Sequence, residues 1–308
     1  MINKLKQFRR KLIAQKCFKN DFKNITLKYN EEKNNYKKVR IMNDNDTINY
    51  MLENKVSICR YGDGEFKWLL GVKEVPAFQK VSNKLSKRLE EIIKDTNNKK
   101  ILICIPNYLN NQDDATIKAN FFWKHFNVTY RKDVDKYLNN KYSYGNTNLT
   151  RPYMDYKNKK VAKERFDNIK KIWKNRNLII IEGNKTRLGV GNDLFNNSKS
   201  IKRIICPGQN AFDKYDEILE KSLQHISKED LILIALGPTA TVLAYDLGNL
   251  DYQAFDIGHI DVEYEWFLKG AKEKVSIANK AVNEVGNFDN VINEENQGYK
   301  KSIIEVIK

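Results

Sequence analysis

Two carboxylates separated by one residue, Asp63 and Glu65, are the side chains of this sequence best suited to chemistry. They follow an apolar, β-prone run that ends at Arg60, and they alternate with Gly62 and Gly64. Glycines let the backbone turn tightly and approach a ligand closely. Paired oxygen ligands suit Mg²⁺ or Mn²⁺ that also holds a diphosphate, and an arginine can bind phosphate through two hydrogen bonds. The segment predicts a divalent-metal and phosphate site, although Gly-Asp-Gly is also common in ordinary turns.

A second candidate segment follows the most apolar run of the chain, residues 231–236. Gly237, Pro238 and Thr239 come where that run ends. Glycine at the end of a strand and proline at the start of a helix predict an anion site at a helix N-terminus, and an ordinary strand-to-helix turn is the alternative. The sequence has no G-x-x-x-x-G-K-[ST] motif and no G-x-G-x-x-G motif opening a helix, which argues against an NTPase and against NAD binding.

The third segment, residues 256–266, places several ionisable groups beside aromatic ones. It begins with Asp256, a candidate for substrate binding, and continues with His259, Glu263 and Glu265. An extended segment would turn the alternating polar groups to one side, whereas a helix would place Asp261 and Glu265 on one face. The sequence leaves both conformations open. In either case His259, Glu263 and Glu265 are the candidates for a general base, with a structural, hydrogen-bonded role as the alternative for His259.

Short apolar runs that alternate with amphipathic segments must position these residues. The runs are typical of strands buried on both faces, and the alternation predicts an α/β fold with a mostly parallel sheet flanked by helices. In such a sheet, ligands bind where the strands end. We predict one catalytic domain over residues 45–270, with helical extensions at residues 1–44 and 271–308.

The N-terminal extension is strongly basic. Residues 2–19 predict a basic amphipathic helix, and residues 20–44 predict a linker or irregular segment, with Asp46 or Thr47 capping the next helix. The basic helix either docks on the domain itself or contacts an anionic membrane surface. The chain has 308 residues and a formal net charge of +16, which suits phosphate-bearing substrates, anionic membranes or nucleic acid.

Four cysteines without C-x-x-C spacing predict neither a zinc site nor a disulfide scaffold, and no signal peptide is evident. We therefore expect a cytoplasmic protein, with membrane association as an open alternative. No RNA- or DNA-binding motif is present, so we expect no nucleic-acid partner.

Blocks of sequence in a fixed order resemble the GT-D glycosyltransferase family. They are RYGDGEF, IEGNKTRLGVGNDLF with IKRIICPGQNAF, and LGPTATVLAYDLG with DIGHIDVEYEWF, and together they cover roughly residues 45–270. The order of several blocks is far more specific than any single motif.

The resemblance implies a Rossmann-like fold and the transfer of a sugar from a nucleotide-sugar, expected to be a UDP-sugar, to a glycan or glycoprotein acceptor. The D-x-E motif of the family matches Asp63-Gly64-Glu65, which would hold Mn²⁺ or Mg²⁺. Arg187, Asn192 and Asp193 fall in the middle blocks and become candidates for lining the donor pocket. The alternatives are a basic membrane- or nucleic-acid-binding module and a phosphoesterase that uses the same carboxylates.

Overall fold

A nine-stranded sheet forms the centre of the computed structural model, which describes residues 2–73, 78–286, 291 and 296–308, with side chains from residue 17 onward. The strand order is β1-β4-β3-β2-β8-β7-β5-β6-β9, and every described pair of neighbouring strands is parallel. The strands are β1 (Arg40–Ile41), β2 (Ser57–Arg60), β3 (Ile101–Ile105), β4 (Ser143–Asn146), β5 (Asn177–Gly183), β6 (Ser200–Cys206), β7 (Leu231–Ala235), β8 (Gln253–Asp256) and β9 (Ile303–Val306).

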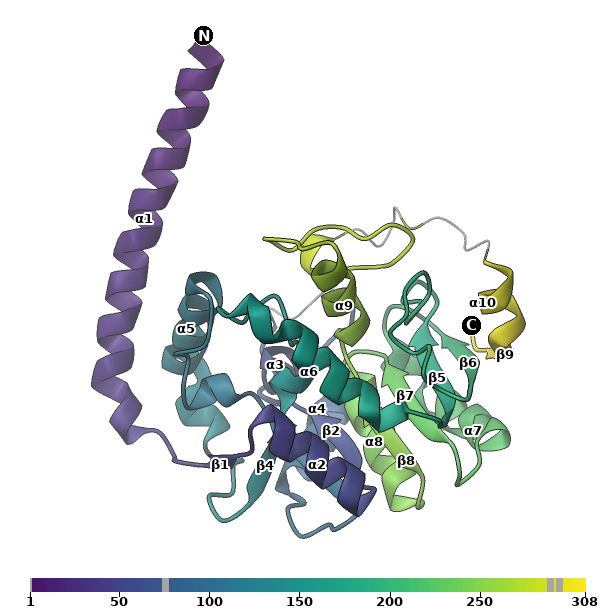
Figure 1. The fold of residues 1–308 in the computed structure, drawn as a ribbon. Coiled ribbons are helices and arrows are strands. Elements are labelled where there is room, and N and C mark those ends of the chain that lie inside the picture. Colours follow the sequence, from purple (N-terminus) through teal and green to yellow (C-terminus); the bar gives the residue numbers. More distant parts are fainter. Residues whose placement is uncertain (1, 74–77, 287–290, 292–295) are drawn as a thin grey trace.

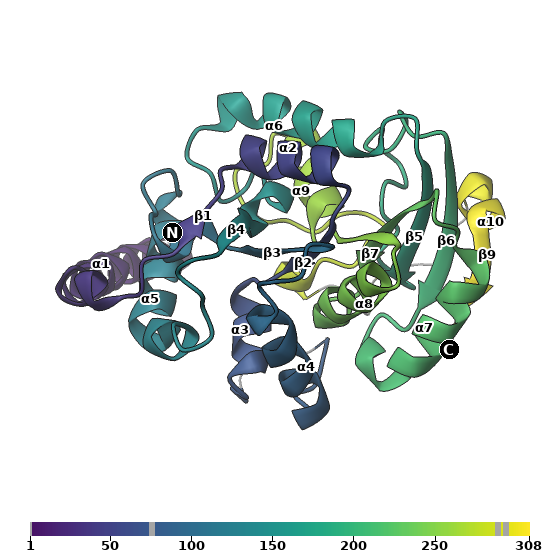
Figure 2. The same ribbon diagram turned by 90° about the horizontal axis from the view of Figure 1, so that it is seen from below.

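Helices cover both faces of this sheet (Figure 1). The α-helices of the described residues are α1 (Ile2–Glu32), which packs against α5 and extends away from the sheet, α2 (Asp44–Asn54), α3 (Asp63–Leu69), α4 (Asn83–Lys94), α5 (Ile117–Val134), α6 (Ala162–Ile169), α7 (Tyr215–His225), α8 (Pro238–Asn249), α9 (Ile260–Leu268) and α10 (Gln297–Ser302). Figure 2 shows α2, α6 and α9 over one face, with α3, α4, α7 and α8 against the other. The predicted α/β fold with flanking helices is confirmed.

The central strands are apolar throughout because both of their faces are buried. In β3, Ile101, Ile103 and Ile105 belong to the hydrophobic core beneath α4 and α8. The alternate residues Leu102 and Cys104 belong to the second core, beneath α2, α6 and α9. Successive side chains of a strand point to opposite faces, so one continuous apolar run supplies both cores. This arrangement fixes the carboxyl ends of the strands along one edge, where the polar segments follow.

The terminal segments differ in part from the sequence prediction. The first helix continues to Glu32, where a linker was predicted, and rings of its second half contact Phe121 of α5. The cap of α2 is Asn43, not Asp46 or Thr47. Each predicted helical extension also contributes an edge strand, β1 and β9, because these short segments pair with β4 and β6. The domain boundaries at residues 44 and 270 stay predictions.

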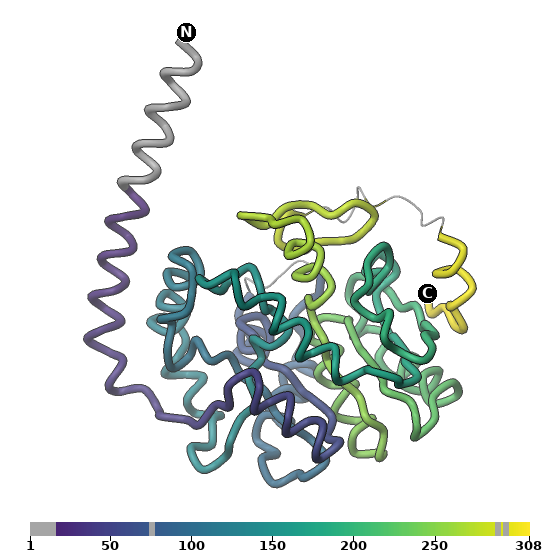
Figure 3. The backbone as a smooth tube through the Cα atoms, in the orientation of Figure 1, coloured from purple at the N-terminus to yellow at the C-terminus, as the bar shows by residue number. Residues whose placement is uncertain are grey.

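The chain after α9 forms a long loop beside the end of that helix (Figure 3). In the part of the chain that the structure describes, no helix combines the length and the apolar character that crossing a bilayer requires.

Candidate active site

A cavity of about 500 Å³ opens along the edge where the parallel strands end. It is lined by the last or the following residue of six strands, namely Arg60, Pro106, Gly183, Pro207, Ala235 and Asp256. In open α/β sheets this edge is the usual place for ligands, because backbone groups and the N-termini of the following helices converge there. The cavity is therefore the candidate active site.

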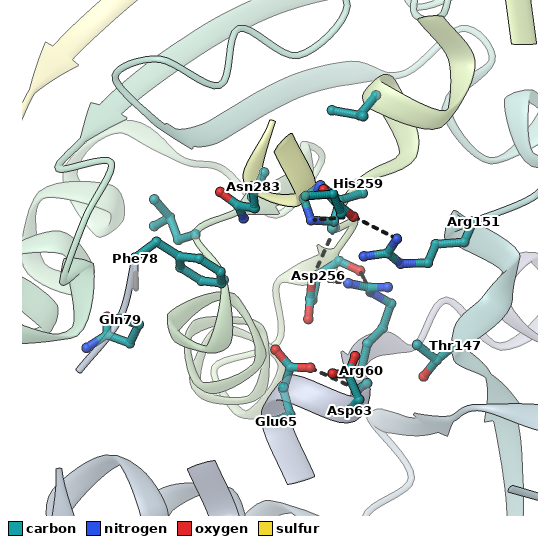
Figure 4. A pocket seen from close by; sticks show the side chains of 18 of the residues that line it. Arg60, Asp63, Glu65, Phe78, Gln79, Thr147, Arg151, Asp256, His259 and Asn283 are labelled. Carbon is teal, nitrogen blue, oxygen red and sulfur yellow. Dashed lines mark hydrogen bonds and ion pairs between the residues drawn. The ribbon is translucent and has the colours of Figure 1, made fainter. Parts of the chain in front are cut away.

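The D-x-E segment lies at this edge, on the first turn of α3. Arg60 ends β2, Gly62 caps the helix, and Asp63 is its first residue. The Oε2 atom of Glu65 accepts a hydrogen bond of 2.8 Å from the backbone N–H of Gly62. Because the first turn of a helix favours negative charge, both carboxylates are stabilised there. Asp63 and Glu65 line the cavity (Figure 4), and Gly62 and Gly64 are also in its lining.

The carboxylates suit a cation that is shared with a substrate. Burial, and then the nearby Asp256 carboxylate, raise the pKa of Glu65 to about 7, while Arg60 opposes the shift. Among the described residues, no three His, Cys, Asp or Glu side chains are grouped so as to hold a metal ion. Mg²⁺ is often bound by one or two carboxylates together with substrate phosphates and water. The donor set fits a cation held jointly with a diphosphate, and it does not fit a site closed by protein alone.

Arg60 is held in place by a buried partner. Its guanidinium forms an ion pair of 3.1 Å with Asp256, whose other carboxylate oxygen accepts from Thr241. Arg60 also donates to the Thr150 hydroxyl and to the backbone oxygen of Asp256. Gly258 has a φ of +50°, and a Cβ there would lie 2.0 Å from a guanidinium nitrogen. Both Arg60 and Asp256 line the cavity. The position of the Arg60 guanidinium requires glycine at position 258, which the sequence did not reveal.

The predicted anion site at the start of α8 is only partly present. Gly237 lines the cavity with a φ of +55°, and a Cβ there would lie 2.4 Å from the ring of Phe78. Pro238 and Thr239 are buried in the first turn of α8, away from the cavity wall. The prediction that these two residues contact the substrate is therefore not supported by their placement. They begin the helix and pack against the core.

The third segment is a helix preceded by His259. Asp256 ends β8, and α9 starts at Ile260, so the helical alternative is the one that the chain adopts. Asp261 and Glu265 lie on one face, where both contact the amino group of Lys280. His259 lines the cavity at the beginning of the helix. Burial lowers the pKa of His259 to about 4, which leaves the imidazole neutral at pH 7.

Comparisons with known proteins identify the family. The profile of the family described as "Glycosyltransferase GT-D fold" matches residues 58–285, which is most of the chain. The chain belongs to this family. This finding confirms the resemblance, and the matched residues include every segment that lines the cavity.

Two curated GT-D relatives are much longer than this chain. Glycosyltransferase GlyD of Streptococcus pneumoniae serotype 4 is 39% identical over 251 residues, which are 82% of this chain and 30% of that protein. The probable glycosyl transferase Gly of Streptococcus gordonii is 37% identical over 269 residues, which are 87% of this chain and 39% of that protein. This chain thus spans about a third of the length of these relatives.

Solved structures show the same fold. One is described as a highly conserved domain of unknown function 1792 with a distinct glycosyltransferase fold. It is 36% identical, with a TM-score of 0.85, over 92% of this chain and 100% of that chain. A glycosyltransferase from Streptococcus sanguinis is 35% identical, with a TM-score of 0.84, over 88% of this chain and 100% of that chain.

Two acidic residues predicted as bases in this GT-D domain lie outside the cavity wall. Glu263 is fully buried, and its Oε2 atom accepts hydrogen bonds from the backbone N–H groups of Tyr153 and Met154. Glu265 accepts from Asn192 and pairs with Lys280. Their place on the helix turns both carboxylates towards other segments. The structure therefore places neither carboxylate in the cavity lining, and the role of Glu263 and Glu265 as bases stays a prediction that this placement does not support.

The three residues predicted to line the donor pocket also have other partners. Arg187 is buried and donates to the backbone oxygen of Asn279. Asn192 donates to Asp261 and Glu265 on α9. Asp193 is half exposed and bonds Lys170 and the Tyr264 hydroxyl. None of Arg187, Asn192 and Asp193 is in the cavity lining, and their contacts are with neighbouring segments, so their predicted part in the donor pocket stays a prediction that this placement does not support.

The sequence reasoning missed a second side of the cavity. Four aromatic residues, Trp68, Phe78, Phe122 and Trp123, also line the cavity. Trp68 and Trp123 are almost fully buried, so they also belong to the hydrophobic core. Arg151 and Glu284 were missed as well. Glu284 comes from the predicted C-terminal extension, where nothing in the sequence singled it out.

The buried Glu263 makes a prediction about pH and stability. Burial, and then Asp155, raise the pKa of Glu263 to about 7 in the folded protein, from its ordinary value of 4.5. The protonated carboxyl therefore contributes most to the stability of the folded protein below pH 4.5, and this contribution is lost as pH rises through 7. Glutamine has no carboxyl to ionise. We therefore expect the free energy of unfolding of Glu263→Gln, minus that of the native protein, to rise by up to about 3 kcal/mol from pH 5 to pH 8. Urea unfolding of both proteins at both pH values measures this difference. A difference that does not change with pH would contradict the raised pKa of Glu263.

Proposed function

We propose that this protein is a metal-dependent glycosyltransferase that moves a sugar from a nucleotide-sugar, specifically a UDP-sugar, to a glycan or glycoprotein acceptor. The observation that carries the proposal is the convergence of Asp63, Glu65 and Arg60 in one cavity at the carboxyl ends of the strands. Membership of the GT-D family and the names of its relatives support the reaction class.

The donor diphosphate would lie between the D-x-E carboxylates and Arg60. Asp63 and Glu65 would hold Mn²⁺ or Mg²⁺, which when bound offsets the negative charge that develops on the departing diphosphate. Arg60 adds a fixed positive charge, and its ion pair with Asp256 keeps the guanidinium from rotating away. Gly62 also lines the cavity, and because it has no side chain, a diphosphate could approach its backbone and the neighbouring carboxylates closely.

His259 is the group that would take the proton from the acceptor hydroxyl. It lines the same cavity, and its lowered pKa of about 4 leaves a free lone pair on the ring at neutral pH. A weak base of this kind gains a proton only as the acceptor oxygen bonds to the sugar carbon. In the same step the bond between the sugar carbon and the diphosphate oxygen breaks, and the diphosphate leaves with the electron pair.

A donor panel tests the proposal. UDP-, GDP- and CMP-sugars are screened by thermal shift with and without Mn²⁺, and those that bind are incubated with glycan and glycopeptide acceptors. We expect a rise in melting temperature with a UDP-sugar that depends on the metal, followed by a product heavier by one sugar. Hydrolysis of the donor without transfer to any acceptor would favour a phosphoesterase. Binding without metal would contradict the role given to the carboxylates.

A further inference from the structure

The segment 277–285 after α9, here called the strap, is anchored firmly beside the cavity. Lys280 is 4% exposed, and its amino group lies 2.7 Å from Asp261 and 3.2 Å from Glu265 on α9. The backbone N–H of Ala281 donates to Lys185 at 2.8 Å, and Arg187 donates to Asn279. A buried lysine between two carboxylates and these loop contacts hold the strap in one position.

The anchored strap brings a carboxylate against His259. Its last turn, Asn283–Val285, places Asn283 and Glu284 in the cavity wall. Oε1 of Glu284 lies 3.7 Å from Nε2 of His259 and 2.9 Å from the guanidinium of Arg151. Figure 4 shows Arg151, from the segment after β4, pointing towards His259, which directly precedes α9. The carboxylate thus lies between an imidazole and a fixed positive charge.

We propose that Glu284 is a positioning residue for His259, with Arg151 holding the carboxylate in place. This inference rests on the proposed function, because it assigns His259 the acceptor proton. A carboxylate facing Nε2 favours the tautomer with its proton on that nitrogen, which leaves the lone pair on Nδ1. When Nδ1 takes the acceptor proton, the ring becomes a cation, and Glu284 stabilises it. The balance is one proton moved from the acceptor oxygen to Nδ1.

The charges around His259 explain why the carboxylate matters. Arg60 on β2, Arg151 after β4 and Lys274 before the strap all disfavour a protonated ring, and burial acts in the same direction. Glu284 is the neighbour that opposes them. Burial would raise the pKa of Glu284, but His259, Arg151 and Lys274 hold that pKa well below its usual range. Without this carboxylate, the imidazolium that forms during transfer would lose the neighbour that offsets Arg60, Arg151 and Lys274.

The test uses the donor found in the panel and measures kcat and KM for Glu284→Gln, His259→Asn and the double variant. We expect Glu284→Gln to lower kcat on the order of 10-fold to 100-fold with little change in the donor KM. In the His259→Asn background, we expect Glu284→Gln to have no further effect, because a residue that acts through His259 has nothing left to position.

A matched control comes from a second His–Glu pair away from the cavity. Glu305 on β9 lies 3.1 Å from His225, so Glu305→Gln removes the same kind of contact and should keep the native kcat. Additive losses in the double variant, or a folded Glu284→Gln protein with native kcat, would overturn the inference while leaving sugar transfer intact. If the native protein transfers no sugar from any donor, the proposed function fails and the inference fails with it.

Discussion

Replacing Asp63 with asparagine is expected to lower kcat/KM by roughly 1,000-fold at saturating Mn²⁺, because a metal that offsets leaving-group charge contributes several kcal/mol to the transition state. Glu65→Gln should have a similar effect. Its amide oxygen can still accept from the N–H of Gly62, so the cap of α3 is kept while the charge is lost. Initial rates with the donor from the panel, measured across a Mn²⁺ titration, provide the comparison.

The control for these variants is Asp193→Asn. Asp193 is a carboxylate in the same domain that pairs with Lys170 outside the cavity wall, so its loss should leave turnover unchanged. The side chain of Asp63 is 35% exposed, and its pair with Lys67 lies at the surface, so the Asp63→Asn protein should fold normally. Native turnover by a folded Asp63→Asn/Glu65→Gln protein would remove the metal from the mechanism.

Replacing Arg203 with methionine is expected to lower the free energy of unfolding by about 3–5 kcal/mol, the usual cost of leaving a buried charge without its partner. Glu182, on β5, is fully buried, and its carboxylate forms an ion pair with Arg203 of β6. Arg203 also donates to the backbone oxygen of Leu188, and Glu182 accepts from the N–H of Leu188. Chemical denaturation at pH 8 measures the loss.

Two further measurements distinguish this mechanism from a general packing defect. Burial raises the pKa of Glu182 and Arg203 opposes the rise, so without the arginine the carboxyl takes up a proton more readily. The deficit of Arg203→Met should therefore be smaller at pH 5 than at pH 8. Lys163→Met, which removes an exposed pair with Asp167, should have no measurable effect. A deficit that is equal at both pH values would point to lost packing.

The local sequence was sufficient to predict the D-x-E segment, where the residues that form the turn also carry the candidate chemistry. The run that ends at Arg60, the two glycines and the D-x-E carboxylates are contiguous, so the same few residues determine both the turn and its chemistry. The sequence left open where the acidic residues after His259 would point. Glu263 and Glu265 belong to a helix that begins just after His259, and their positions on its surface turn them away from the cavity that His259 faces.

By itself, the sequence determined the parallel α/β architecture and the position of the acidic turn, because both depend on the period of apolar residues and on neighbours along the chain. Only the tertiary structure decided which other groups meet that turn. Asp256 lies 196 residues from Arg60, and Glu284 lies 133 residues from Arg151. Such pairs depend on strand order and on how a distant segment is anchored, and no local pattern of residue types encodes either.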